Sequence, residues 1–513
     1  MTLPKSARKA VDRPKSATAI RSGIRTATKS TFRSPLKSPL SSAYRPALAM
    51  LAMTLVLAGC AGFSGDGGRA RVDALAGPRL GQPWSASRDA LRNPQAAQDE
   101  VRRLLAAPLS ADDAVRITLL NNPRVNIALA DLGIAEADLV QAGRLRNPRF
   151  GFGRLSGDDG VEIDRSVMFD LVGLLTLPMR TAVEQRRFEQ AQLQTALQAV
   201  RLASDTRRAY FQALAAEQSL AYLRQAALAS EASAELAQRM AKAGNFSKLD
   251  EAREQAFHAE VSAQLKRAEH GALAARERLV RLLGLSGDDA SLRLPERLPD
   301  LPAMLASGTD IESTAMAQRL DLQVARLDAE ATAKNLGLTR ATRFVNVFEL
   351  GYQNKSTTGA ARADGYQIEL TLPVFDSGEA RLRRAEASYQ RTLLRTAEVA
   401  LQARSEVREG YSRMRSQYQV ARQYRDEIVP ARKRISEEVL LRYNGMLASV
   451  FELLADARSQ IASVTAAIDA QRDYWIAESE LQYAIHGGST AGGGASLPAS
   501  SNTSAMPAAA GAH

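Results

Sequence analysis

The chain has 513 residues, a formal net charge of +11 and an aromatic content of 5%. Residues 1–45 hold eleven Lys or Arg and one acid, Asp12, so this arm carries +10 and the remaining residues about +1. A nearly neutral body without a basic stripe and interleaved aromatic residues excludes nucleic acid as its partner. The abundance of Ala, Leu, Arg, Glu and Gln in the middle of the chain favours long helices.

The first predicted element is a leader. An apolar run at 46–58 follows the basic arm; it is too short to span a bilayer and fits the core of a secretory signal. Leu57-Ala58-Gly59-Cys60 resembles the lipobox of bacterial lipoproteins, which implies removal of residues 1–59 and acylation of Cys60. Cys60 is the sole cysteine, so no intramolecular disulfide can form. The alternative is a buried thiol after a chance apolar run.

Residues 60–108 are punctuated by Gly and Pro and are expected to be extended or loosely helical. The ordered body begins at Leu109. Ser110 can cap a helix, and Asp112 and Asp113 favour its first turn. A helical pattern then continues to about Leu145 and is broken before Pro148.

Two strand pairs are expected, at about 148–178 and about 343–375, because the apolar period changes there from helical to two. The apolar residues of one face are Val167, Phe169, Leu171, Leu175 and Leu177 in the first pair, and Phe344, Phe348, Leu350, Tyr352, Tyr366, Ile368, Leu370, Leu372 and Val374 in the second. Such alternation suits a membrane β-strand with one lipid face, and equally a sheet that covers a soluble core.

Two very long helical stretches follow the strand pairs, from Arg180 to Leu283 and from about Glu379 to Ile485. Gly244 and Gly445 lie near the middle of these stretches and are predicted to form the tips of antiparallel helical hairpins. Arms of this length need lateral partners, which predicts a coiled-coil-like assembly.

The chain also contains a tandem duplication. Leu175-Thr176-Leu177-Pro178 returns as Leu370-Thr371-Leu372-Pro373, and Tyr210 and Tyr411 are 201 residues apart, as are the two tip glycines. The predicted unit is helix, strand pair and long helical hairpin, repeated at 109–284 and 310–487. A linker at 285–309 joins the repeats, and the Gly-, Ala- and Ser-rich residues 488–513 are expected to be a disordered tail.

Catalysis has little support in the sequence. The four histidines show no ligand spacing, and no Walker A, H-E-x-x-H or G-x-S-x-G motif is present. We therefore predict that the chain is not an enzyme and that it binds no metal or cofactor other than the covalent lipid on Cys60.

The sequence resembles the TolC family of bacterial outer-membrane efflux proteins, in its lipoprotein branch. The segments that carry the resemblance are Leu109–Val115 with Asn121-Asn122-Pro123, Gln141–Pro148, Leu372–Gly378, and Tyr443 with Gly445, Ser449, Leu453 and Leu454. They cover roughly residues 110–487 in the order and spacing of the family.

The resemblance implies a mainly α fold with a membrane β-barrel contribution. Three chains would share one twelve-stranded β-barrel in the outer membrane, continued through the periplasm by an α-barrel. The expected partners are two further copies of the chain, outer-membrane lipid, a periplasmic adaptor and an inner-membrane pump. The expected function is a passive duct for toxic solutes; metal ions and small organic compounds both fit an open aqueous conduit.

The family closes its channel at the helical tips, often with acidic rings. Asp250 and the adjacent Glu251 follow the first tip, while Glu452 and Asp456 are the nearest acids after the second. The resemblance therefore implies a periplasmic gate at these four residues, with Asp250 the favoured one, although all four also suit ordinary helix surfaces.

One alternative function stays open. A lipid-tethered periplasmic coiled-coil protein without a pore would share the lipobox and the long helices. The duplicated strand pairs argue against it, because a spacer has no use for them.

Overall fold

The computed structural model describes residues 62–81, 94–158, 160–287, 292–305, 308–345 and 347–489. All of them belong to one compact unit, Cys60–His513. The predicted leader, Cys60 and nearly all of the predicted tail lie outside the described residues.

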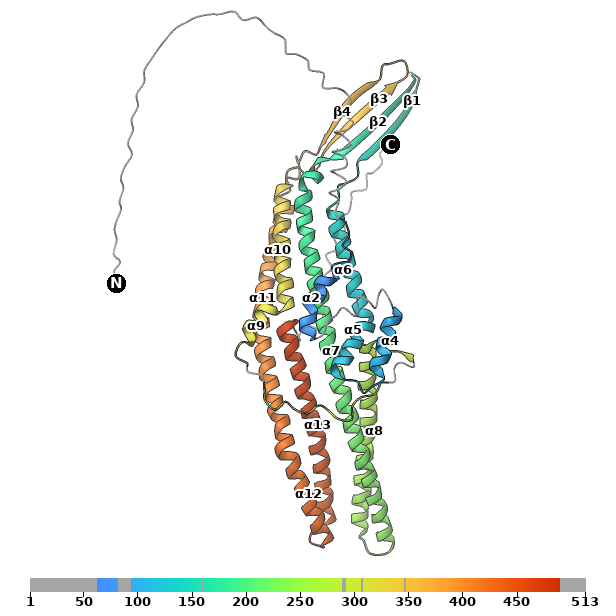
Figure 1. Cartoon of the computed structure of the whole chain (residues 1–513), viewed down its shortest axis with the longest axis vertical. Helices are drawn as coiled ribbons and strands as arrows, with labels where there is room; N and C mark the ends of the chain where they lie inside the picture. The colour runs from blue at the N-terminus through green and yellow to red at the C-terminus, as the bar shows by residue number, and fades with distance from the viewer. Residues whose placement is uncertain are drawn as a thin grey trace, which may run out of the picture. The chain divides into compact units, whose positions relative to one another are not determined.

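Both copies of the predicted unit are present, in the same order (Figure 1). The first comprises α5 (Ala111–Asn121), α6 (Pro123–Ala142), β1 (Arg149–Gly157), β2 (Gly160–Asp170), α7 (Leu171–Lys242) and α8 (Lys248–Leu283). The second comprises α9 (Ile311–Gln318), α10 (Leu320–Ala341), β3 (Phe348–Thr357), β4 (Ala363–Leu370), α11 (Glu379–Gln423), the π-helical turn η2 (Tyr424–Ile428), α12 (Val429–Asn444) and α13 (Val450–His486). The expectation of a mainly helical fold built from this duplicated unit is confirmed.

The four strands form one antiparallel sheet in the order β1-β2-β3-β4, so the β2–β3 pairing joins the two repeats. The sheet lies at one end of the helices, and the hairpins α7/α8 and α12/α13 turn at the other end (Figure 1). The first tip is the segment 243–247 and the second tip is 445–449. Pro430, which has no N–H, follows the π-helical turn that interrupts the second long helix.

Two expectations about the strands were wrong at their ends. Leu171, Leu175 and Leu177 belong to α7, because Asp170 caps that helix by accepting from the Gly173 N–H at 2.7 Å. Residues 371–378 leave the sheet, so the alternation of Leu372 and Val374 does not continue β4. Phe344 likewise precedes β3.

Residues 60–108, expected to be extended or loosely helical, contain two regular helices, α2 (Arg69–Leu80) and α4 (Pro94–Leu105). Val72, Ala76 and Leu80 are spaced by four residues and are 2% exposed or less. They belong to the same buried cluster as Phe188 and Leu193 of α7. The nearby Gly and Pro residues concealed this short apolar stripe.

In each repeat, a side chain at the start of the second helix forms a hydrogen bond to the end of the last helix. The Asn122 side chain caps α6 and donates to the Leu282 carbonyl at the end of α8, at 2.7 Å. At the equivalent place in the second repeat, Arg319 precedes α10 and donates to the Ala484 carbonyl near the end of α13, at 3.2 Å. The two contacts satisfy carbonyls that a helix end leaves without an intrahelical partner.

Gly284 ends α8 in the left-handed conformation, with φ of +70°. A Cβ atom there would lie 2.8 Å from the Asn121 carbonyl oxygen. We expect Gly284→Ala to lower the free energy of unfolding by about 1–3 kcal/mol, since backbone strain and the clash add. The measurement is the shift of the denaturation midpoint in detergent. Gly271→Ala in the same helix, with open space around it, is the matched control.

Candidate conduit wall and gate

The sheet has one apolar face. Residues paired directly across an antiparallel sheet point to the same side. One such row is Phe150, Val167, Tyr352 and Tyr366, and the next is Phe169, Leu350 and Ile368. Phe150 is 69% exposed and Tyr366 is 81% exposed, so the described part of the chain leaves this face largely uncovered.

The opposite face of the sheet is polar. Asp170, Glu349 and Glu369 form one row across three strands. Arg149 pairs with Glu349, and farther along the sheet Lys355 pairs with Glu162 at 2.5 Å. β1 and β4 each pair with one strand only among the described residues, so both edges of the sheet are open. The arrangement can separate an apolar from an aqueous phase once its edges are closed.

The first tip places Asp250 and Glu251 in the first turn of α8. Gly244 turns the chain with φ of +80°. The Ser247 hydroxyl accepts from the Asp250 N–H at 3.0 Å and donates to the Asp250 carboxylate at 2.7 Å. Asp250 also pairs with Arg253 at 3.1 Å, and Glu251 accepts from Gln255 at 3.3 Å. Ser247 therefore caps α8, and the Asp250 carboxylate supports this cap and carries one ion pair.

The second tip has the same cap but a different turn. Ser449 and Glu452 form a reciprocal capping box at the start of α13. Glu452 thus occupies the same helical position as Asp250, an equivalence that sequence matching did not bring out. Gly445 has φ of −82°, and Met446, at φ of +58°, takes the left-handed conformation in its place. Asp456, one turn farther on, is 8% exposed.

Two arginines connect the first hairpin to the second. Arg458 of α13 pairs with Glu260 of α8 at 3.0 Å and lies 5.3 Å from the centre of the Phe257 ring. Arg253 of α8 lies 5.4 Å from the centre of the Phe451 ring of α13. We call these contacts the hairpin latch. Single-sequence reasoning missed them because both partners are ordinary charged or aromatic helix residues.

An apolar cluster lies beside the latch, formed by Ala227, Phe257, Val261, Val450 and Leu454. Glu254, the residue after Arg253, is 4% exposed and accepts from the Ser233 hydroxyl at 2.9 Å. Burial raises the pKa of Glu254, and the Ser233 hydrogen bond opposes that shift only in part. Asp250 and Glu452 therefore lie on two neighbouring hairpins, α7/α8 and α12/α13. Beside the latch, these hairpins contact each other through the apolar cluster.

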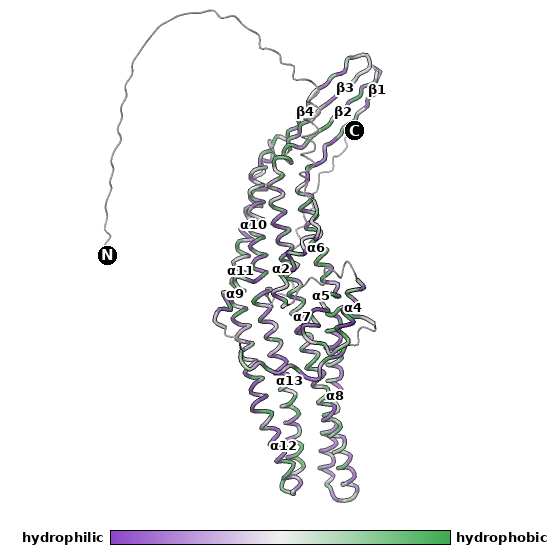
Figure 2. Tube along the Cα trace, viewed as in Figure 1, coloured by the Kyte–Doolittle hydropathy of each residue, from purple (hydrophilic) through white to green (hydrophobic). Residues whose placement is uncertain are grey.

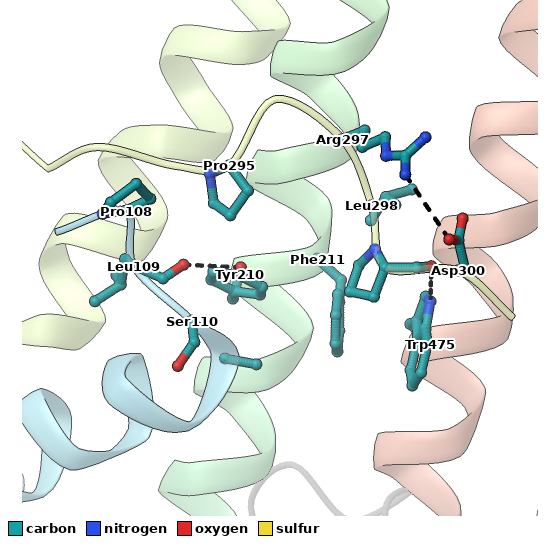
Figure 3. A pocket seen from close by; sticks show the side chains of 12 residues that line it. Pro108, Leu109, Ser110, Tyr210, Phe211, Pro295, Arg297, Leu298, Asp300 and Trp475 are labelled. Atoms are coloured by element: carbon teal, nitrogen blue, oxygen red, sulfur yellow. Dashed lines mark hydrogen bonds and ion pairs between the residues drawn. The ribbon is translucent and has the colours of Figure 1, made fainter. Parts of the chain in front are cut away.

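A cavity of about 490 Å³ lies where the linker crosses α7 and α13 (Figure 3). Phe211 and Trp475 stack in its wall at 5.6 Å between ring centres. The Tyr210 hydroxyl donates to the Leu109 carbonyl at 2.9 Å, and the Trp475 indole donates to the Pro299 carbonyl at 3.0 Å. Burial and the nearby Asp113 raise the pKa of Tyr210 to about 12. Tyr210 and Trp475 thus use their polar groups to bind backbone carbonyls at the cavity.

No group of three or more His, Cys, Asp or Glu side chains in the described ranges could hold a metal ion. None of the helices that the structure describes is long and apolar enough to cross a membrane; hydrophilic residues recur along each long helix in Figure 2.

No protein-family model matches the sequence, and no curated protein matches it. Solved structures do match the fold. A membrane protein from Pseudomonas aeruginosa aligns with a TM-score of 0.64 at 22% identity, over 75% of this chain and 93% of that one. The CmeC outer membrane channel of Campylobacter jejuni aligns with a TM-score of 0.64 at 15% identity, over 74% and 86%.

The outer membrane protein VceC of Vibrio cholerae aligns with a TM-score of 0.62 at 18% identity, over 74% of this chain and 96% of its own. The fold is therefore that of TolC-like outer-membrane channels, as the sequence resemblance implied.

Proposed function

We propose that this chain is the outer-membrane channel of a tripartite efflux system and works as a homotrimeric passive duct. The observation that carries the proposal is the open-edged sheet with one apolar and one polar face, continued directly by paired long helices. In a membrane every strand edge must find a partner, so a four-stranded sheet has to close with other copies. Three copies give a twelve-stranded barrel with an apolar outside and a polar lumen.

The helical hairpins would then enclose the periplasmic part of the conduit, with both tips at its entrance. Met446 and Leu447 are 94% and 81% exposed at the second tip, which supports contact with a periplasmic adaptor there. An inner-membrane pump would supply the driving force. The acylated Cys60 would anchor the mature chain to the outer membrane.

The test is conductance across planar bilayers by the purified mature protein, together with its mass in detergent. Trimers that give discrete conductance steps support the proposal. Monomers without conductance would contradict it and favour the lipid-tethered spacer.

We further propose that Asp250 attracts cations at the gate. Asp250→Asn keeps an acceptor for the Ser247 cap and removes the charge, so the ratio of potassium to chloride permeability should fall about twofold or more. Glu269→Gln, which removes an acid of α8 paired with Lys266 well above the tip, is the control. An unchanged ratio in Asp250→Asn would show that Asp250 only supports the helix cap.

A further inference from the structure

All four connections between sheet and helices lie at one end of the sheet (Figure 1). β1 and β3 begin there, and β2 and β4 end there. The connections expose a shared set of apolar and basic side chains that the duct function does not use. We call this set the junction collar: Arg144, Leu145, Leu174, Leu175, Arg343, Phe344, Val345, Leu372, Val374, Phe375, Arg381 and Arg384.

The apolar side chains of the junction collar are more exposed than large apolar side chains in folded proteins normally are. Leu175 is 75% exposed, Val374 74% and Phe375 103%. Apolar residues that cluster in this way mark an interaction surface, whereas isolated ones do not.

The arginines of the junction collar lack carboxylate partners in the described part of the chain. The acids at this level are already paired: Asp170 with Arg146 at 3.1 Å, Glu349 with Arg149, Glu379 with Arg383 at 2.7 Å, and Glu386 with Arg340 at 3.0 Å. Asp376 accepts from the Gly378 N–H at 2.8 Å, and Glu369 lies beside Glu349 on the polar face of the sheet. Arg144, Arg381 and Arg384 are exposed and form no ion pair with any described residue.

We propose that the junction collar binds the anionic phosphate headgroups of phospholipids in the leaflet that meets the helices, an inference that rests on the proposed insertion of the sheet. A guanidinium group matches a phosphate in charge and geometry. Neighbouring apolar side chains would enter the acyl region while the arginines reach the headgroups. Arg343, whose guanidinium stacks 4.8 Å from the centre of the Phe344 ring, shows this pairing of a charge with an apolar surface.

A second copy of the chain fits the junction collar less well than phospholipid headgroups do. It could cover the apolar side chains, but of the acids at this level only Glu369 and Asp376 have no cation partner among the described residues. Two carboxylates do not neutralise the three unpaired arginines of each facing collar. Charge complementarity selects a non-protein anion for this surface.

The test compares the triple variant Arg144→Gln, Arg381→Gln, Arg384→Gln with the control Arg415→Gln, Lys433→Gln, Arg434→Gln. The control removes the same charge from exposed sites on α11 and α12 that form no ion pair with the described residues and lie far from the sheet. Trimers in detergent are mixed with vesicles of phosphatidylethanolamine, with or without added phosphatidylglycerol, and the fraction bound after flotation gives the affinity. Each arginine at an anionic surface contributes about 1 kcal/mol, or roughly fivefold, so the triple variant should lose the preference for phosphatidylglycerol about tenfold or more. The control should keep it.

Three outcomes would overturn the proposal. One is an unchanged lipid preference in a triple variant that still conducts; the duct function then survives and only the lipid surface is lost. Another is loss of the trimer in detergent without lipid, which would make the junction collar a contact between copies. The third is a denaturation midpoint that inorganic phosphate raises as much as phosphatidylglycerol does. If no variant and no wild-type protein conducts, the proposed function itself fails.

Discussion

In the duct that we propose, the double variant Arg253→Ala, Arg458→Ala is expected to open the channel. It removes both elements of the hairpin latch, the Arg458–Glu260 ion pair at 3.0 Å and the two arginine–aromatic contacts between α8 and α13. An exposed ion pair contributes about 0–1 kcal/mol and each cation–π contact about 0.5–1 kcal/mol. The sum is about 2 kcal/mol per chain.

Three chains that open together would multiply this energy, so the fraction of open channels should rise about tenfold or more. The measurement is the open probability in planar bilayers at low ionic strength, where exposed charges are least screened. Arg442→Ala removes an arginine of the second hairpin whose partner, Glu438, lies on the same helix, and is the control. A closed channel that stays closed in an intact trimer of the double variant would show that the apolar cluster alone holds the hairpins.

Exchanging the charges of Arg458 and Glu260 distinguishes an effect of the hairpin latch from a general loss of stability. Arg458→Glu alone should open the channel, because two acids then face each other across the hairpins. Adding Glu260→Arg should close it again, since the pair is restored with its charges reversed. Failure of the second change to restore closure would count against the ion pair and leave the ring contact as the active part of the latch.

Much of the fold could be predicted because the helices and strands follow periodic apolar patterns and the whole unit is repeated in the sequence. Tyr210 and Tyr411 fall at equivalent places: Tyr210 bonds to Leu109 at the start of the first repeat, and Tyr411 packs against Gly308 just before the second. The Ser247 and Ser449 caps also follow local rules that act over three residues.

Other features escaped because they depend on contacts distant in sequence or on competition between local signals. The alternation of Val167 and Phe169 seemed to continue through Leu171, but the Asp170 cap starts a helix there. At the second tip Gly445 suggested the left-handed residue, yet Met446 adopts that conformation. The candidate gate acids Asp250 and Glu452 were found from their positions after the tips. The latch between Arg458 and Glu260 could not be predicted, because it depends on the packing of α8 against α13.

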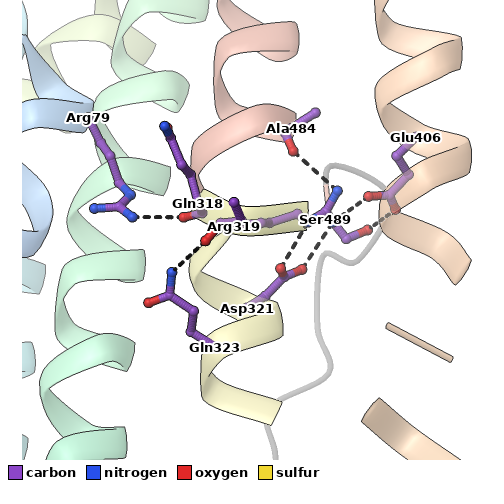
Figure 4. Close-up of polar contacts among 9 residues, drawn as sticks. Arg79, Gln318, Arg319, Asp321, Gln323, Glu406, Ala484 and Ser489 are labelled. Carbon is purple, nitrogen blue, oxygen red and sulfur yellow. Dashed lines mark hydrogen bonds and ion pairs between the residues drawn. The ribbon is translucent and has the colours of Figure 1, made fainter. Parts of the chain in front are cut away.

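The second large effect is expected at Arg319, whose side chain is fully buried (Figure 4). It pairs with Asp321 at 2.8 Å and with Glu406 of α11 at 2.6 Å, and it donates to the Ala484 carbonyl of α13. Burial lowers the pKa of Arg319, but the two carboxylates outweigh that effect and raise it above the ordinary value. Ser489 also donates to Glu406 at 2.5 Å, so one cluster joins α10, α11 and the end of the second repeat.

Arg319→Met should lower the free energy of unfolding by about 3–5 kcal/mol, because two half-buried carboxylates lose their shared cation. The exposed pair of Arg395 and Glu398 gives the control: Arg395→Met should cost about 0.5 kcal/mol or less. The measurement is denaturant unfolding in detergent, followed by tryptophan fluorescence, since Trp475 lies on α13.

The cause of the lower stability of Arg319→Met can be tested by neutralising the two carboxylates that lose their partner. If unpaired charge is the cause, adding Asp321→Asn and Glu406→Gln to Arg319→Met should recover more than half of the lost stability, although the cluster is gone. If instead the contact with the α13 carbonyl dominates, the combined variant should stay as unstable as Arg319→Met. A loss below about 1 kcal/mol in the single variant would mean that the cluster exchanges its ion pairs for water and does not hold α10, α11 and α13 of the second repeat together.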